Sequence, residues 1–88
     1  MTLQRDVLLV LVNMRKESAV KVQEVLTGWG CLIKTRLGLH EGTLDNCSET
    51  GLIFLELVGD KEKHQELARK LNLLAGVQAQ LISLSVAA

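Results

Sequence analysis

Apolar and polar positions alternate along this chain with two different periods, and the period changes several times. Apolar residues in unbroken runs or at every second position are typical of strands, whereas apolar residues at i, i+3, i+4 and i+7 are typical of helices. The pattern predicts strands at residues 7–12, 31–39, 52–58 and 77–84, and helices at residues 17–28 and 61–74.

The order of these elements is β-α-β-β-α-β, which is the order found in ferredoxin-like domains. We therefore predict an α+β fold in which a four-stranded antiparallel sheet carries both helices on one face. The chain of 88 residues forms a single such domain, near the lower size limit for a self-sufficient core.

The details of the pattern assign faces to the elements. Every residue from 7 to 12 is apolar, so this strand needs cover on both faces and belongs in the centre of the sheet. In the next strand we expect one shared face, consisting of Ile33, Thr35, Leu37 and Leu39.

The ends of the helices are also predicted. Asn13 or Ser18 caps the first helix, Asp60 caps the second, and Gly76 ends the second. His64 falls at the margin of the apolar stripe of the second helix, where no ligand role is expected.

Two helices cover only one face of such a sheet, and the other face is usually polar. Here the strands at residues 7–12, 52–58 and 77–84 offer apolar side chains to both faces, although Gln78 and Gln80 make one face of the last strand more polar. An exposed aliphatic sheet favours association, so we predict a homo-oligomer, a homodimer or a tetramer. The alternative is that bulges or strand register hide this surface.

Composition narrows the choice of partners and compartment. Lys plus Arg and Asp plus Glu both number 10, so the formal charge is zero and we expect neither nucleic acid nor membrane as a partner. No run approaches the roughly 18 apolar residues that a transmembrane helix needs, and residues 7–12 lack the features of a signal peptide. Cys31 and Cys47 are predicted to be free thiols, because a strand separates them. A soluble, cytoplasmic protein is expected.

Four segments of the sequence carry a family resemblance. They are Val10-Leu11-Val12-Asn13-Met14-Arg15, Arg36-Leu37-Gly38-Leu39-His40, Gly51-Leu52-Ile53, and Lys70-Leu71-Asn72 with Gly76-Val77. Together they resemble small proteins labelled iron-only hydrogenase system regulators. Those proteins are similar to stand-alone ACT-like domains and to the C-terminal sensing domain of nickel-responsive repressors. The resemblance spans residues 7–85 and implies a ferredoxin-like fold, oligomers built through sheets or sheet edges, and a regulatory role without catalysis.

A metal site is the first candidate for chemistry. Residues 40–49 form the longest polar stretch and join the second and third predicted strands. His40 and Asp45-Asn46-Cys47 are similar to the His and Asp-Asn-Cys that nickel-repressor sensing domains place in the comparable hairpin. One His and one Cys cannot complete a tetrahedral or square-planar site, so His40 and Cys47 from adjoining subunits would have to combine. The alternative is a solvated hairpin with a free Cys, without any cofactor.

A small anionic effector is the second candidate. Arg36 beside Gly38 can bind a carboxylate or phosphate through two hydrogen bonds. Asn13 and Arg15 lie in the loop before the first helix, where backbone donors at a helix start favour anions. The alternative for these arginines is ordinary surface charge. Loop 13–18 lacks the Gly that amino-acid-binding ACT domains usually carry there.

The sequence predicts no enzyme. RNA-recognition versions of this fold need stacking aromatic residues on the central strands, but only Trp29 and Phe54 are aromatic here. Copper-chaperone versions need Cys-x-x-Cys in the first loop, and acylphosphatases need a Gly-rich phosphate loop; both are absent. We therefore expect a non-catalytic regulatory or interaction module that forms a homo-oligomer with room for a small ligand between subunits. Metal sensing through His40 and Cys47 is the alternative.

Overall fold

A computed structural model describes residues 1–13, 16–43 and 46–88, with side chains for residues 1–13, 17–38 and 51–88. Its elements follow the predicted order, with one short 3₁₀ helix added. They are β1 (Thr2–Val12), α1 (Lys16–Gly28), η1 (Gly30–Leu32), β2 (Ile33–Thr43), β3 (Asn46–Leu57), α2 (Lys61–Asn72) and β4 (Val77–Ala87).

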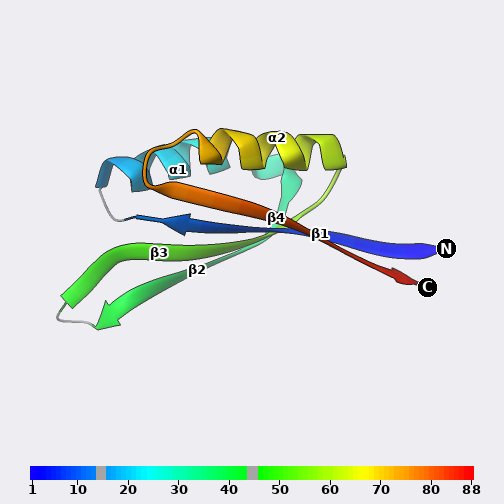
Figure 1. The fold of residues 1–88 in the computed structure, drawn as a ribbon, viewed down its shortest axis with the longest axis horizontal. Coiled ribbons are helices and arrows are strands. Elements are labelled where there is room, and N and C mark those ends of the chain that lie inside the picture. Colours follow the sequence, from blue (N-terminus) through cyan, green and yellow to red (C-terminus); the bar gives the residue numbers. More distant parts are fainter. Residues whose placement is uncertain (14–15, 44–45) are drawn as a thin grey trace.

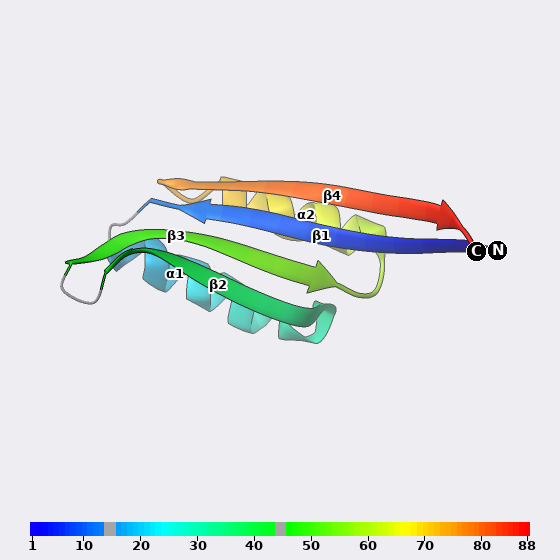
Figure 2. The same cartoon turned by 90° about the horizontal axis from the view of Figure 1, so that it is seen from below.

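The strands form one antiparallel sheet in the order β2-β3-β1-β4. Both helices lie on the same side of this sheet (Figures 1 and 2). The fold is therefore an α+β ferredoxin-like βαββαβ sandwich, as predicted. The central position of β1 is also confirmed, because it pairs with β3 on one side and with β4 on the other. The helices cover only one of its faces, so the cover that its unbroken apolar run predicted for the second face is not supplied within one subunit.

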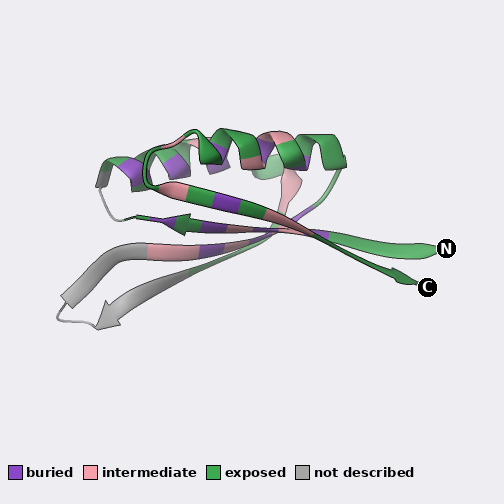
Figure 3. Cartoon of the chain, in the orientation of Figure 1, coloured by how far each residue is buried: buried purple, intermediate pink, exposed green. Residues whose placement is uncertain are grey.

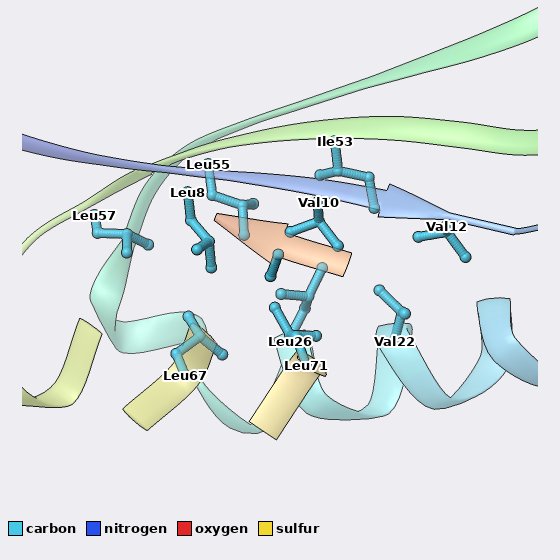
Figure 4. Close-up of a cluster of buried hydrophobic side chains, with 11 residues drawn as sticks. Leu8, Val10, Val12, Val22, Leu26, Ile53, Leu55, Leu57, Leu67 and Leu71 are labelled. Carbon is cyan, nitrogen blue, oxygen red and sulfur yellow. The ribbon is translucent and has the colours of Figure 1, made fainter. Parts of the chain in front are cut away.

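The core lies between the helices and one face of the sheet (Figure 4). In β1 the buried residues alternate with less buried ones from Asp6 to Val12. The helices contribute side chains one turn apart, such as Val22 with Leu26. Each fully buried aliphatic side chain stabilises the fold by about 1.5–3 kcal/mol. The buried apolar residues are Leu8, Val10, Val12, Val22, Leu26, Ile53, Leu55, Leu57, Leu67, Leu71 and Ala79.

The beginning of β2 departs from the prediction. Cys31 and Leu32 belong to η1, so the strand begins at Ile33 and not at residue 31. A register shift then falls between Ile33 and Thr35. Ile33 pairs with the core residue Leu57, whereas Thr35 pairs with Glu56 on the other face. The predicted shared face of Ile33 and Thr35 is therefore wrong, because an irregularity of one residue reverses the alternation that follows it.

All four strands are longer than predicted. β2 and β3 continue through most of the expected polar loop at residues 40–49, with His40 opposite Gly51 and Gly42 opposite Cys47. β1 begins at Thr2 and not at residue 7, and β4 continues to residue 87. The alternation rule detects strands with one buried face. The extensions of β1 and β4 lie beyond the core, where backbone pairing defines the strand.

The outer ends of β1 and β4 form a two-stranded extension that we call the terminal arm, residues 2–5 paired with residues 84–87. The arm runs past the beginning of α2, and both chain termini lie side by side at its tip (Figures 1 and 2). It contributes to an elongated shape with extents of 49 × 24 × 18 Å. Among the described residues, no helix is long and apolar enough to cross a membrane.

Candidate functional site

The face of the sheet opposite the helices is a candidate interaction surface, and we call it the open face. Strand register and alternation determine its members. The apolar ones are Leu3, Val7, Leu9 and Leu11 of β1, Leu37 of β2, Leu52 and Phe54 of β3, and Ile82, Leu84 and Val86 of β4. The polar ones are Arg5, Thr35, Glu56, Gln78 and Gln80.

Several aliphatic side chains on the open face are well exposed. Leu11 is 50% exposed, Leu37 54%, Leu84 60% and Val86 61%. Figure 3 shows that both strands of the terminal arm are exposed, whereas buried and intermediate residues occupy the middle of β1 and β4. The predicted surplus of apolar side chains on this face is therefore confirmed, and Gln78 and Gln80 lie on it as expected.

A polar cluster interrupts the open face at one place. Arg5 Nε lies 3.7 Å from Glu56 Oε2, and the hydroxyl of Thr35 donates to Glu56 Oε1 at 3.3 Å. Both side chains of the ion pair are partly solvated, so the pair contributes little to stability. This polar cluster interrupts the apolar surface of the open face. Uninterrupted apolar surface remains nearer the β2–β3 hairpin and on the β4 side.

A buried polar network lies on the opposite, helix-covered side. His64 Nδ1 is 2.7 Å from Asp6 Oδ2, and His64 Nε2 is 2.7 Å from the carbonyl oxygen of Val58. The hydroxyl of Ser83 donates to Asp6 Oδ1 at 2.7 Å. The network joins α2 to β1, to β4 and to the segment that follows β3. The prediction that His64 lies at the margin of its stripe is wrong, because His64 is only 3% exposed.

The geometry of the network determines its chemistry. Both ring nitrogens of His64 face groups that can accept a hydrogen bond, a carboxylate oxygen at Nδ1 and a backbone carbonyl oxygen at Nε2. The hydrogen bond from His64 holds the pKa of the Asp6 carboxyl below its ordinary value, against the opposing effect of burial. Ser83 donates to Asp6 and not to His64, so the Ser83–Asp6–His64 arrangement does not activate a nucleophile.

An open cleft of about 540 Å³ adjoins the network at the beginning of α2. Its walls include the cations Arg5, Lys34 and Lys61 and the carboxylates Glu56 and Asp60. The two signs of charge nearly balance, so no strong preference for an anion or a cation follows. Asp60 is the N-cap of α2 by position, as predicted, although its side chain makes no capping hydrogen bond.

The ligand residues predicted from sequence lie in different parts of the fold. The backbone N–H of Asn13 donates to Gly76 O at 2.6 Å. Both residues line a second cleft of about 440 Å³. Arg36 points to the helix side of the edge strand β2 and donates to Gln23 of α1 at 2.5 Å. Gly38 follows on the same strand and pairs with Ile53. The structure therefore does not bring Asn13 together with Arg36 and Gly38, and Arg15 lies outside the described residues.

The metal candidates lie in the β2–β3 hairpin. His40 is on β2 and Cys47 is on β3, and their side chains are outside the described part of the chain. Cys31, for which a side chain is described, is an exposed free thiol, as predicted. Elsewhere in the described residues, no group of three or more His, Cys, Asp or Glu side chains converges.

Comparisons with known proteins agree on the fold. No protein-family model matches the sequence, and no curated protein matches it either. The uncharacterized protein TM1266 from Thermotoga maritima has a similar structure, with a TM-score of 0.78, 24% identity, and coverage of 96% of this chain and 99% of that chain. CPII, a nitrogen regulatory PII-like protein from Thiomonas intermedia K12 solved with ADP, AMP and bicarbonate, has a TM-score of 0.61 and 12% identity, with 99% of each chain covered.

A third structure, described as that of a PII-like signaling protein from Thermus thermophilus, gives a TM-score of 0.64 at 10% identity. The match covers 97% of this chain and 91% of that chain. At these identities the likeness shows the fold, and it covers almost the whole of each protein. The class defined by fold is thus the ferredoxin-like α+β domain, which the PII-like proteins share.

Proposed function

We propose that this protein is a non-catalytic regulatory module that works as a homo-oligomer and holds a small ligand at a subunit interface. The single observation that carries the proposal is the open face, where the aliphatic residues Leu11, Leu37 and Leu84 are each at least half exposed. Contiguous exposed apolar surface of this kind marks interaction sites in soluble proteins. A second copy presents the same surface, so two-fold packing of like faces is the simplest way to cover it.

The regulatory part of the proposal draws support from two sources. PII-like proteins share the fold over nearly the full chain. The sequence also resembles iron-only hydrogenase system regulators in the segments around Asn13, Gly38 and Gly76. We therefore propose the regulator type of that family, without enzymatic activity, and a cytoplasmic location.

Sedimentation velocity of matched variants tests the assembly. Leu37→Glu and Leu11→Glu place a charge on the open face, at positions that are 54% and 50% exposed. Val20→Glu places the same charge on α1, at a position that is 56% exposed. We expect both open-face variants to sediment as a smaller species. The dissociation constant of the oligomer should rise at least about tenfold, because assembly would bury an unpaired charge in the interface. The Val20→Glu variant should match the wild type; equal behaviour of all three variants would contradict the proposal.

Adenine nucleotides are the first ligand class to test, since CPII was solved with ADP and AMP. We retain Asn13, Arg15, Arg36 and Gly38 as proposed ligand residues; Asn13 and Gly76 share the cleft of about 440 Å³. Calorimetry with ADP and AMP should show binding that Asn13→Ala weakens at least about tenfold and that Lys21→Ala on α1 leaves unchanged. If neither nucleotide binds wild-type protein, the ligand proposal fails while the assembly proposal stands.

Metal sensing is a second proposal, favoured by the hairpin that puts His40 and Cys47 on adjacent strands. A transition metal would need ligands from an adjoining subunit as well, because two ligands do not complete a site. Metal analysis of purified wild-type, His40→Ala and Cys47→Ala proteins tests it. Equal metal content in all three proteins would rule the site out.

A further inference from the structure

The two edge strands of the sheet, β2 and β4, differ in how readily a strand from another molecule can pair with them. The edge strand β2 carries Lys34 and Arg36 and has two register shifts along its pairing with β3. The other edge strand, β4, has no charged residue or proline from Val77 to Ala87, and its pairing with β1 is regular throughout. Charges and bulges are the usual devices that prevent edge pairing, so β4 is the edge that remains available.

The contact made by Asn72, at the end of α2, shows which backbone N–H and C=O groups of β4 point outward, that is, away from β1 and toward the free edge of the sheet. Its side-chain amide donates to the carbonyl oxygen of Ala79 at 2.9 Å and accepts from the N–H of Ala79 at 2.8 Å. The amide thus occupies the place of a neighbouring strand at Ala79. Because backbone direction alternates along a strand, the N–H and C=O groups of Leu81, Ser83, Ser85 and Ala87 also point outward. Among the described residues, no side chain caps these later positions as Asn72 caps Ala79.

We propose that β4 pairs antiparallel with β4 of a second copy of this chain over residues 81–87, with Leu84 on the two-fold axis. In this register Leu81 lies opposite the partner's Ala87, and Ser83 lies opposite the partner's Ser85. Each such pair exchanges two backbone hydrogen bonds. The register uses every outward-pointing residue from 81 to 87 and leaves the Asn72–Ala79 contact intact. The two sheets become one continuous sheet.

Side chains in this register are self-complementary. On the open face Leu84 meets the partner's Leu84, and Ile82 meets the partner's Val86, so apolar residues pair with apolar residues. On the other face Ser83 meets the partner's Ser85, so hydroxyl residues pair with each other. Cross-strand pairs of matched polarity stabilise sheets. This match is what favours a second copy of the chain over an unrelated strand.

The terminal arm supplies an independent reason for pairing. It consists of two strands only and extends past α2 (Figure 1). Its apolar residues Leu3, Leu84 and Val86 are 46%, 60% and 61% exposed. A two-stranded ribbon is marginally stable by itself in water. Pairing through β4 places each arm within a ribbon of four strands.

This inference goes beyond the proposed function, because edge pairing requires neither a ligand nor packing of open faces. The two contacts use different groups: edge pairing uses the outward backbone of β4, whereas face packing uses side chains such as Leu37. Variants can therefore remove each contact separately.

Cysteine crosslinking tests the register, in full-length protein that carries Cys31→Ser and Cys47→Ser. Residue 84 forms a non-hydrogen-bonded pair with its own copy, with Cα atoms about 4.5 Å apart, which a disulfide can span. Ile82 lies about 14 Å from the partner's Ile82. Under mild oxidation we expect Leu84→Cys to form a covalent dimer and Ile82→Cys to stay uncrosslinked. Absence of the Leu84→Cys dimer, or equal crosslinking of Ile82→Cys, would overturn the proposal.

A proline variant separates edge pairing from face packing. Ser85→Pro removes an outward N–H without disturbing the pairing with β1, and Ser85→Ala is the matched control. Added to Leu84→Cys, Ser85→Pro should abolish the crosslink, Ser85→Ala should preserve it, and Leu37→Glu should also preserve it. Loss of the crosslink in the protein that combines Leu84→Cys with Leu37→Glu would show that face packing alone brings the cysteines together. That result would contradict the edge-pairing proposal. A persistent crosslink in Ser85→Pro would overturn it equally.

Discussion

The carboxylate of Asp6 and the imidazole of His64 meet at 2.7 Å although 58 positions separate them in the chain. Both side chains are almost completely buried, at 5% and 4% exposure. The pair joins the start of β1's core segment to the first turns of α2, and Ser83 and Val58 complete its hydrogen bonds. A buried polar network with every member satisfied rigidifies the elements it joins.

Removal of His64 should be strongly destabilising. His64→Ala leaves the Asp6 carboxylate buried beside a single remaining hydroxyl donor and leaves the Val58 carbonyl unpaired. Breaking a buried pair in this way costs about 3–5 kcal/mol of the free energy of unfolding. Urea unfolding followed by circular dichroism measures the loss. The control is Glu66→Gln, which alters an exposed ion pair with Arg69 and should leave stability nearly unchanged.

Stability should decrease in acid because of Asp6. Its pKa is lower in the folded protein than the ordinary value of 3.8, mainly through the hydrogen bond with His64. The unfolded chain therefore takes up this proton more readily, so the contribution of Asp6 is fully present above pH 3.8 and is lost as pH falls through the folded-state pKa. The free energy of unfolding, measured from neutral pH to below that range, should fall more steeply for wild type than for Asp6→Asn. Parallel curves would contradict this assignment.

Asn72 should stabilise the edge of the sheet. Asn72→Ala removes both hydrogen bonds to the backbone of Ala79, and we expect a loss of about 1–3 kcal/mol in the free energy of unfolding. Asn72→Asp keeps the acceptor for the Ala79 N–H but loses the donor to its carbonyl, so it should not restore wild-type stability. Thermal unfolding of the three proteins checks this order. A wild-type melting temperature for Asn72→Asp would show that the bidentate contact is unimportant.

Gly76 should tolerate no side chain. Its φ of +74° is a left-handed conformation, and an added Cβ would lie 3.2 Å from Cβ of Asn13. Gly76→Ala should therefore lower the free energy of unfolding by about 1–2 kcal/mol, which chemical denaturation can measure. Gly28→Ala is the matched control, because nothing lies within 4 Å of a Cβ there. A similar loss in both variants would mean that the backbone conformation of Gly76 is not responsible.

The arrangement of elements could be predicted from the sequence because the core residues repeat with clear periods. The unbroken apolar run at residues 7–12 indicated a central strand, and Leu67 and Leu71 indicated the buried side of α2. The ends of the strands could not be predicted, because residues 2–5 and 84–87 lie beyond the core and are held by backbone pairing. The shift at Ile33 has no signal in composition, since a bulge changes register without changing residue type.

The polar contacts were harder to predict than the core. His64 has the spacing of a buried position relative to Leu67 and Leu71, which is the signal that could have identified it. Its partner Asp6 precedes an apolar strand, and no local rule relates two residues so far apart in sequence. The double contact of Asn72 with Ala79 depends likewise on how α2 and β4 are placed in space. Long-range pairs of this kind follow from tertiary packing and not from local pattern.

The solution mass of the wild-type protein, measured by light scattering at micromolar concentration, tests self-association through the exposed sheet most directly. The monomer mass is 9.7 kDa. We predict a mass of at least twice this value, reduced by Leu37→Glu and unaffected by Val20→Glu. A strictly monomeric mass for the wild-type protein would contradict both the covered open face and the paired β4 edge.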